Sequence, residues 1–130
     1  MKLEHIAINV ADPRAMAAWY QKNMGLTLVR KTDAAPHTHF LADSSGTVML
    51  EIYNNPPDQV PPYPKMHPLQ LHIAFVSADP EADKSTLLHA GATLVDELRL
   101  GDGSHLVMLR DPWGLALQLC RRATPMLKGQ

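Results

Sequence analysis

The sequence predicts an α+β fold in which two βαβββ modules form a cupped eight-stranded mixed sheet with helices on its outer face. An internal repeat is the main reason. The nine residues His5–Pro13 return without a gap, and with six identities, as His72–Pro80, 67 positions later. A repeat of this size indicates two similar modules related by a pseudo-twofold axis.

A second repeated motif precedes the last strand of each half. Residues Leu41–Gly46, read as Leu-Ala-Asp-x-x-Gly, match Leu109–Gly114, read as Leu-Arg-Asp-x-x-Gly, at an offset of 68. The offset between the halves is therefore one residue larger here than at their first strands. The duplication nevertheless extends through each half.

The first half reads as a strand, a helix and three further strands. Asp12 supplies an N-cap and Pro13 the first helical position of a helix that ends at Gly25. Apolar and β-branched runs between turn residues indicate the strands. The predicted strands are Leu3–Val10, Thr27–Lys31, Thr38–Ala42 and Thr47–Tyr53.

The second half repeats this order of elements. Asp79 and Pro80 again form a cap followed by proline, and the helix is expected to run to Gly91. The predicted strands are Leu71–Val76, Thr93–Arg99, Ser104–Leu109 and Leu115–Cys120.

A proline-rich segment separates the halves. So many prolines favour an extended backbone and oppose a helix or a central strand. We therefore expect one domain, residues 1–130, with a first module at about 1–54, a linker at about 55–68, a second module at about 69–122 and a tail at 123–130. The prolines of the segment are Pro56, Pro57, Pro61, Pro62, Pro64 and Pro68.

The bulk properties exclude several classes of protein. A net charge of −1 over 130 residues gives no reason to expect nucleic acid or an anionic membrane as partner. No apolar run approaches the roughly 18 residues that span a bilayer. The single cysteine, Cys120, excludes an internal disulfide and fits a reducing compartment. The first residues pass directly into a strand pattern without a signal peptide, so we expect a cytoplasmic location.

Four polar residues occupy matched positions in the repeat. His5 corresponds to His72, and Glu51 corresponds to Gln118, both at an offset of 67. Side chains alternate along a strand, and in each of these four strands the opposite face carries only large apolar residues, whereas the polar residue lies among small or mixed ones. We expect the apolar faces to pack on the helices and the four polar side chains to meet in the cleft of the cupped sheet.

This set of side chains suits a metal ion. Two imidazoles, one carboxylate and one amide oxygen are ligands for Zn, Ni, Co, Mn or Fe(II). Each residue alone has an ordinary alternative, since strand histidines are commonly hydrogen-bonded in the core or on the surface and strand glutamates are commonly solvated. Their symmetric placement predicts a divalent metal site formed by His5, Glu51, His72 and Gln118.

Other histidines have less defined roles. His37 and His105 match at an offset of 68, and two roles fit them: orienting ligands or contacting substrate, or bonding within the structure. His67 lies in the proline-rich linker, where we expect it to be solvated.

These motifs resemble those of the vicinal oxygen chelate superfamily, which includes glyoxalase I, methylmalonyl-CoA epimerase, extradiol dioxygenases and bleomycin-resistance proteins. The shared features are the His…Asp-Pro opening of each half, Trp19-Tyr20 before Met24-Gly25-Leu26, and the stretch Arg110–Gly114 before the last strand. The resemblance extends from Leu3 to Arg121 and implies the same paired βαβββ modules.

In the metal-dependent lyases and isomerases of this superfamily, the ligands come from the first and last strand of each module. The resemblance thus implies His5, Glu51, His72 and Gln118 as ligands, and Glu51 is then the only evident base among them. It implies proton abstraction next to a carbonyl of a small oxygen-chelating substrate, with a metal-stabilised enediolate. Gln118 departs from the family, which usually has glutamate there, and a neutral amide cannot accept the proton.

Two alternatives within the superfamily stay open. One is a metal-free protein that binds a small ligand or an antibiotic, of the bleomycin-resistance type, in which the four polar residues are only hydrogen-bonded. The other is an extradiol-type dioxygenase, against which Gln118 counts because it stands where those enzymes have a carboxylate. Expected partners are a small-molecule substrate or ligand and a second copy of the chain in a homodimer, without nucleic acid or membrane.

Overall fold

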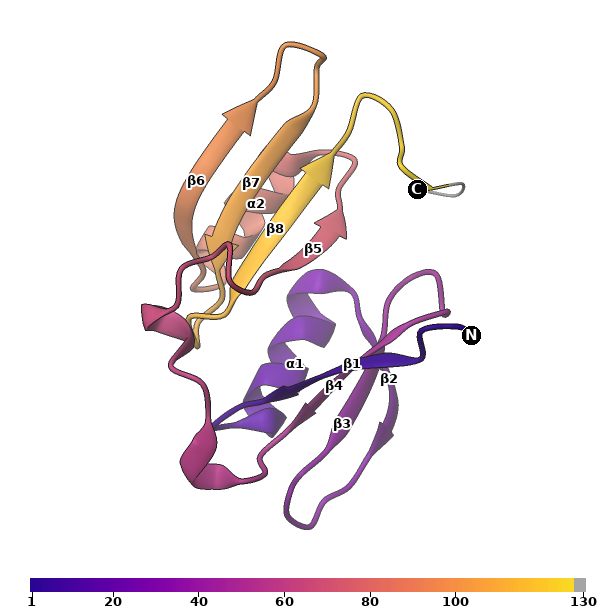
Figure 1. Ribbon diagram of the computed structural model, residues 1–130, viewed down its shortest axis with the longest axis vertical. Coiled ribbons are helices and arrows are strands. Elements are labelled where there is room, and N and C mark those ends of the chain that lie inside the picture. Colours follow the sequence, from indigo (N-terminus) through magenta and orange to yellow (C-terminus); the bar gives the residue numbers. More distant parts are fainter. Residues whose placement is uncertain (128–130) are drawn as a thin grey trace. The chain divides into compact units, whose positions relative to one another are not determined.

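The computed structural model describes residues 1–127 and contains eight strands in two four-stranded mixed sheets (Figure 1). The chain divides into two compact units, Met1–Pro61 (unit 1) and Pro62–Gln130 (unit 2). Each unit has the order βαβββ, which confirms the predicted fold class. The boundary falls inside the proline-rich segment. Residues 128–130 of the predicted tail lie outside the described residues.

Unit 1 forms a sheet with the strand order β1-β4-β3-β2. The first strand, β1, pairs in parallel with β4, and the other neighbours are antiparallel. Helix α1 makes the crossover that parallel pairing requires and packs over β3 and β4. The bounds are β1 His5–Asn9, α1 Pro13–Met24, β2 Thr27–Lys31, β3 His39–Ala42 and β4 Met49–Tyr53.

Unit 2 has the same topology, with the order β5-β8-β7-β6 and a parallel pair β5–β8. Helix α2 packs over β7 and β8. Predicted and observed element ends differ by at most two residues throughout. The bounds are β5 Ile73–Val76, α2 Pro80–His89, β6 Thr93–Arg99, β7 His105–Arg110 and β8 Ala116–Arg121.

Both helices begin as predicted. The Asp12 carboxylate accepts a hydrogen bond from the Ala15 N–H at 3.0 Å, and Asp79 accepts one from the Ala82 N–H at 3.1 Å. Helix α1 ends at Gly25 in the left-handed region, with φ of 68°. No helix within residues 1–127 combines the length and the apolar composition needed to cross a membrane.

The core of each unit lies between its helix and its sheet. Ile52 and Leu117, on the helix-facing sides of β4 and β8, are fully buried, as the alternation predicts. Ile6 is an exception, because it is 49% exposed although it shares its face with buried Ile8. Its strand, β1, is at the edge of the sheet, and α1 packs over β3 and β4 instead.

The proline-rich segment differs from the expectation of a purely extended linker. It contains two short 3₁₀ turns, η1 (Pro57–Gln59) and η2 (Tyr63–Lys65), each with proline in its first turn. Proline is accepted there because its missing N–H would have no partner inside the turn. Arg110 donates to the carbonyl of Tyr63 at 2.8 Å and to that of Met66 at 2.6 Å. These bonds hold η2 against β7 within unit 2.

Gly114 permits a close contact between η2 and the turn before β8. Its φ is +86°, and a Cβ added there would lie 2.4 Å from Pro64 Cγ and 2.8 Å from Pro64 Cα. Only glycine fits both the backbone conformation and the space.

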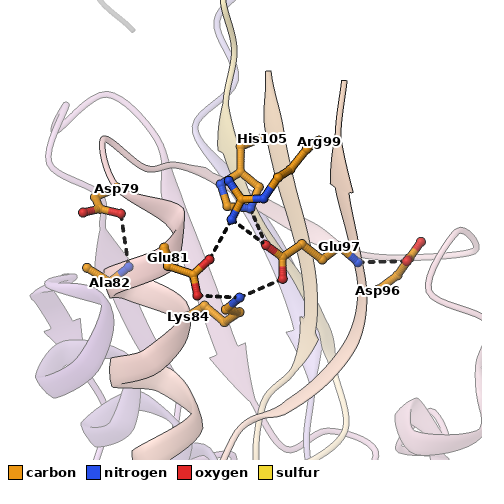
Figure 2. A network of polar contacts seen from close by, with 8 residues as sticks. All are labelled: Asp79, Glu81, Ala82, Lys84, Asp96, Glu97, Arg99 and His105. Carbon is orange, nitrogen blue, oxygen red and sulfur yellow. Dashed lines mark hydrogen bonds and ion pairs between the residues drawn. The ribbon is translucent and has the colours of Figure 1, made fainter. Parts of the chain in front are cut away.

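A network of ion pairs ties α2 to the sheet of unit 2 (Figure 2). Lys84 lies 2.8 Å from a carboxylate oxygen of Glu81 and 2.7 Å from one of Glu97. The buried His105 lies 2.7 Å from the other Glu97 oxygen, and Arg99 reaches both glutamates. Hydrogen bonds from Lys84 and then His105 lower the pKa of Glu97 from its ordinary 4.5 to about 2.

Replacing Gly114 with alanine tests the contact with Pro64. Gly103 is the matched control, because its φ is +92° and nothing lies near its added Cβ. Gly103→Ala should cost about 1–2 kcal/mol for backbone strain alone. Gly114→Ala should cost at least about 1–3 kcal/mol more, because Pro64 must also move. Urea unfolding measures both, and equal losses would contradict a close contact.

Acid unfolding tests the Glu97 network. Because the pKa of folded Glu97 is lowered to about 2 from 4.5, its contribution to stability is complete above about pH 4.5 and is lost as the pH falls towards 2. The wild type should therefore lose stability relative to Glu97→Gln over this range. Asp58→Asn, at an exposed position on η1, is the control and should keep the wild-type slope. Parallel stability curves for wild type and Glu97→Gln would contradict the assignment.

Candidate functional site

His5 and Glu51 come together on the open face of the unit 1 sheet. Their strands are parallel neighbours, with Glu51 opposite Ala7, two residues beyond His5. The Nε2 atom of His5 lies 3.3 Å from Oε2 of Glu51, and their side chains are 34% and 20% exposed. The Phe40 ring lies edge-on to the imidazole, with centroids 5.7 Å apart. The pair thus offers two half-buried potential ligand atoms on the face of the unit 1 sheet that α1 does not cover.

The spacing of this pair fits two ligands of one ion. Metal–nitrogen and metal–oxygen bonds of about 2.1 Å place two adjacent ligand atoms roughly 3.0–3.4 Å apart, from octahedral to tetrahedral angles. The observed 3.3 Å lies within this range. On the far side of the ring, Nδ1 of His5 forms a hydrogen bond with the carboxylate of Glu4. Nε2 is therefore the ring atom that faces Glu51.

His72 and Gln118 occupy the equivalent positions in unit 2. Gln118 is opposite Ala74, again two residues beyond the histidine. The Nδ1–H of His72 donates to the Pro68 carbonyl at 3.0 Å, and the Cys120 thiol donates to Oε1 of Gln118 at 3.2 Å. Both side chains are half-buried. The hydrogen bonds found for His72 and Gln118 are thus with Pro68 and Cys120 and not with each other. His5 and Glu51, in contrast, face one another directly.

The Cys120 thiol is held in its neutral form. Burial raises its pKa, with a smaller opposing effect from Arg122. Cys120 therefore acts as a hydrogen-bond donor that orients the Gln118 amide, and a raised pKa disfavours the reactive thiolate.

A hollow of about 270 Å³ lies beside Gln118 in unit 2. It is on the sheet face opposite α2, since Met108 pairs with Gln118 and shares its side. One wall comes from the linker, where exposed His67 accepts a hydrogen bond from the Leu69 N–H at 3.2 Å. The proline-rich composition also allowed the segment to rim a pocket, but only the fold shows that His67 lies beside the sheet. The lining residues are His67, Pro68, Leu69, Val95, Asp96, Leu98, Leu106, Met108 and Gln118.

Sequence reasoning missed a second group of possible metal ligands, namely Glu81, Glu97 and His105. One ligand atom from each lies within 4.8 Å of the others. However, Lys84 and Arg99 already contact these carboxylates at 2.7–3.1 Å (Figure 2). The two cations balance the two carboxylates, so the group is built as a salt-bridge network between helix and sheet. The spacing of Glu81 and Lys84, three apart on a helix, is the only sequence signal for it.

His37 has a different setting from His105. It lies in the loop before β3, with a φ of 57° and Nδ1 at 2.8 Å from the Asp33 carbonyl and 3.1 Å from an Arg14 nitrogen. Its contacts fix the loop to the start of α1.

Solved structures with this fold include proteins of different function. TnmS3, an antibiotic binding protein from Streptomyces sp. CB03234, superposes with a TM-score of 0.72 and 16% identity, over 92% of this chain and 94% of its own. A glyoxalase family protein from Enterococcus faecalis gives 0.71 and 25%, over 92% and 97%. Lactoylglutathione lyase from Agrobacterium tumefaciens gives 0.67 and 21%, over 91% of both chains.

Comparison with curated proteins finds no match. A family model described as Glyoxalase/Bleomycin resistance protein/Dioxygenase superfamily matches residues 2–119, which is nearly the whole chain. The duplicated βαβββ fold, the similar solved structures and this match agree, and the chain belongs to the glyoxalase/bleomycin resistance protein/dioxygenase superfamily.

Proposed function

We propose that the protein is a glyoxalase-type, metal-dependent lyase or isomerase that acts on a small oxygen-chelating substrate. In this proposal His5, Glu51, His72 and Gln118 hold one divalent ion, of Zn, Ni, Co, Mn or Fe. The observation that carries it is the contact of His5 Nε2 with Glu51 Oε2 at 3.3 Å, which fits two ligands of one ion. The matching register of His72 and Gln118 supports the second half of the site.

Glu51 is the proposed base. A bound divalent ion supplies a Lewis acid that makes the carbon next to a substrate carbonyl more acidic. The Glu51 carboxylate takes this proton onto an oxygen, whereas the neutral Gln118 amide can only bind or orient.

A homodimer and a cytoplasmic location remain predictions. In support of the homodimer, β1 and β5 are edge strands of their sheets. Ile6 on β1 is 49% exposed and Val76 on β5 is 62% exposed, so both edges offer apolar surface as well as backbone hydrogen-bonding groups.

A metal-free binding protein is the second candidate. The hollow beside Gln118 favours it, because most of its lining residues are apolar and Gln118 supplies a hydrogen-bonding group. The fold similarity to the antibiotic binding protein TnmS3 is consistent with such a role. In this alternative the four polar residues are only hydrogen-bonded.

Metal analysis separates the two candidates. Untagged protein purified without chelator should contain about one equivalent of a divalent metal, and His5→Ala and His72→Ala should each lose it. His89→Ala is the control, because this exposed ring bonds the Ser85 carbonyl at the end of α2. Protein that is metal-free and takes up none of the five metals would overturn the proposal. Thermal stabilisation by an antibiotic panel in the presence of chelator would then support the binding protein.

Deuterium exchange tests the role of Glu51. Metal-loaded protein incubated in deuterated water with hemithioacetals, α-keto acids or acyl thioesters should catalyse exchange next to the carbonyl. Glu51→Gln should slow it by about 100-fold or more, as expected for loss of a general base. Gln118→Glu, which adds a second carboxylate, should retain the exchange. Proton NMR follows the signal, and undiminished exchange in Glu51→Gln would remove this residue as the base.

A further inference from the structure

We propose that Glu4 is a positioning residue for His5, which it holds in the tautomer and orientation that turn Nε2 towards Glu51. The inference rests on the proposed metal site and adds to it a residue outside the four ligands. Its basis is the hydrogen bond between Nδ1 of His5 and Oε2 of Glu4, on the opposite side of the ring from Glu51.

The chemistry of imidazole makes this bond decisive for Nε2. A neutral ring carries hydrogen on one nitrogen and a lone pair on the other. The Glu4 carboxylate only accepts hydrogen bonds, so it selects the form with hydrogen on Nδ1. The lone pair is then on Nε2, 3.3 Å from Glu51 Oε2. A metal ligand needs this lone pair, and its direction is set by the ring that Glu4 holds.

Phe40 restricts the ring further. Its centroid lies 5.7 Å from that of His5 at an interplanar angle of 85°, which is an edge-on aromatic contact. Glu4 at one nitrogen and Phe40 at the ring leave His5 little freedom to flip. The half-site of unit 1 is therefore arranged before any ion arrives.

His72 shows the same arrangement with a different acceptor. Its Nδ1–H donates to the Pro68 backbone carbonyl at 3.0 Å, so its lone pair is also on Nε2. A carboxylate partner increases the electron density of an imidazole more than a neutral carbonyl does. His5 is thus the stronger ligand of the two, and this difference depends on Glu4.

Glu4 can be replaced without disturbing the fold. Its side chain is 70% exposed. Its backbone carbonyl accepts from the Met49 N–H at 3.0 Å, and this bond next to β1 does not involve the side chain. Substitutions of Glu4 therefore test the hydrogen bond to His5 rather than stability.

Nitrogen-15 NMR of histidine-labelled, metal-free protein reads the tautomer directly. The spectra are taken at alkaline pH. His5 in the wild type should carry hydrogen on Nδ1, and in Glu4→Ala it should shift to a mixture of both forms. Glu4→Asp, whose carboxylate still only accepts, should restore the Nδ1–H form. His72 should be unchanged in both variants. A wild-type His5 that already populates both forms, or a Glu4→Ala spectrum identical to wild type, would overturn the inference.

Zinc binding measured by calorimetry gives the second readout. Glu4→Ala should weaken binding by about 10-fold or more, within the 10–100-fold range usual for partners of ligating histidines. Glu4→Asp should lose less, and Asp58→Asn, which like Glu4→Ala removes one negative charge from unit 1, should bind like wild type. Unchanged affinity in Glu4→Ala would overturn the inference while leaving the metal site in place. If wild-type protein binds no zinc, manganese, nickel, cobalt or iron(II), the proposed function fails, and the NMR result alone decides the role of Glu4.

Discussion

Parallel pairing of the first and last strand in each unit is the constraint on which the candidate site depends. Two parallel neighbours cannot be joined by a tight turn, so a helix must cross over one face of the sheet. Helices α1 and α2 take that face and its apolar side chains, which leaves the other face to the polar ones. In both pairs the histidine lies two residues before the position opposite the Glu or Gln. One register, used twice, therefore gives each histidine the same position relative to the Glu or Gln of its own unit.

The two matched pairs, His5 with Glu51 and His72 with Gln118, nevertheless differ in their chemistry. In unit 1 a carboxylate faces His5 at 3.3 Å, and Glu4 supports the ring from behind. In unit 2 the corresponding residue is the amide of Gln118, which accepts a hydrogen bond from the Cys120 thiol. The carboxylate of the two matched pairs is thus in unit 1, whereas the apolar hollow lies in unit 2. In the proposed function, unit 1 binds and moves the proton and unit 2 shapes the ligand site.

Local signals explain why most of the fold could be predicted. Asp12 and Asp79 act as caps through bonds to backbone atoms three residues away, so sequence alone reveals them. Strand alternation likewise placed Glu51 and Gln118 on the face away from the helices. The contact between Gly114 and Pro64 could not be predicted, because it joins segments 50 positions apart in the sequence. Ile6 was assigned to a buried face because alternation alone does not reveal which strand lies at the edge.

Most of the salt-bridge network likewise could not be predicted from the sequence. His105 was recognised as part of the repeat, but its partners come from α2 and β6. Lys84 and Arg99 bind that group into a link between α2 and β6, whereas within residues 1–127 no Lys or Arg ion pair is found for His5 or Glu51. Residue type alone does not separate these two kinds of cluster; the neighbouring cations do.

The central claim is that one ion is bound by the two matched half-sites. Anomalous diffraction from crystals of the manganese- or zinc-loaded protein tests it most directly, because it locates the ion and its ligands together. A single strong peak per chain is expected, bonded to Nε2 of His5, a carboxylate oxygen of Glu51, Nε2 of His72 and Oε1 of Gln118. A peak at Glu81, Glu97 and His105 instead, or an ion held by one half-site alone, would contradict it.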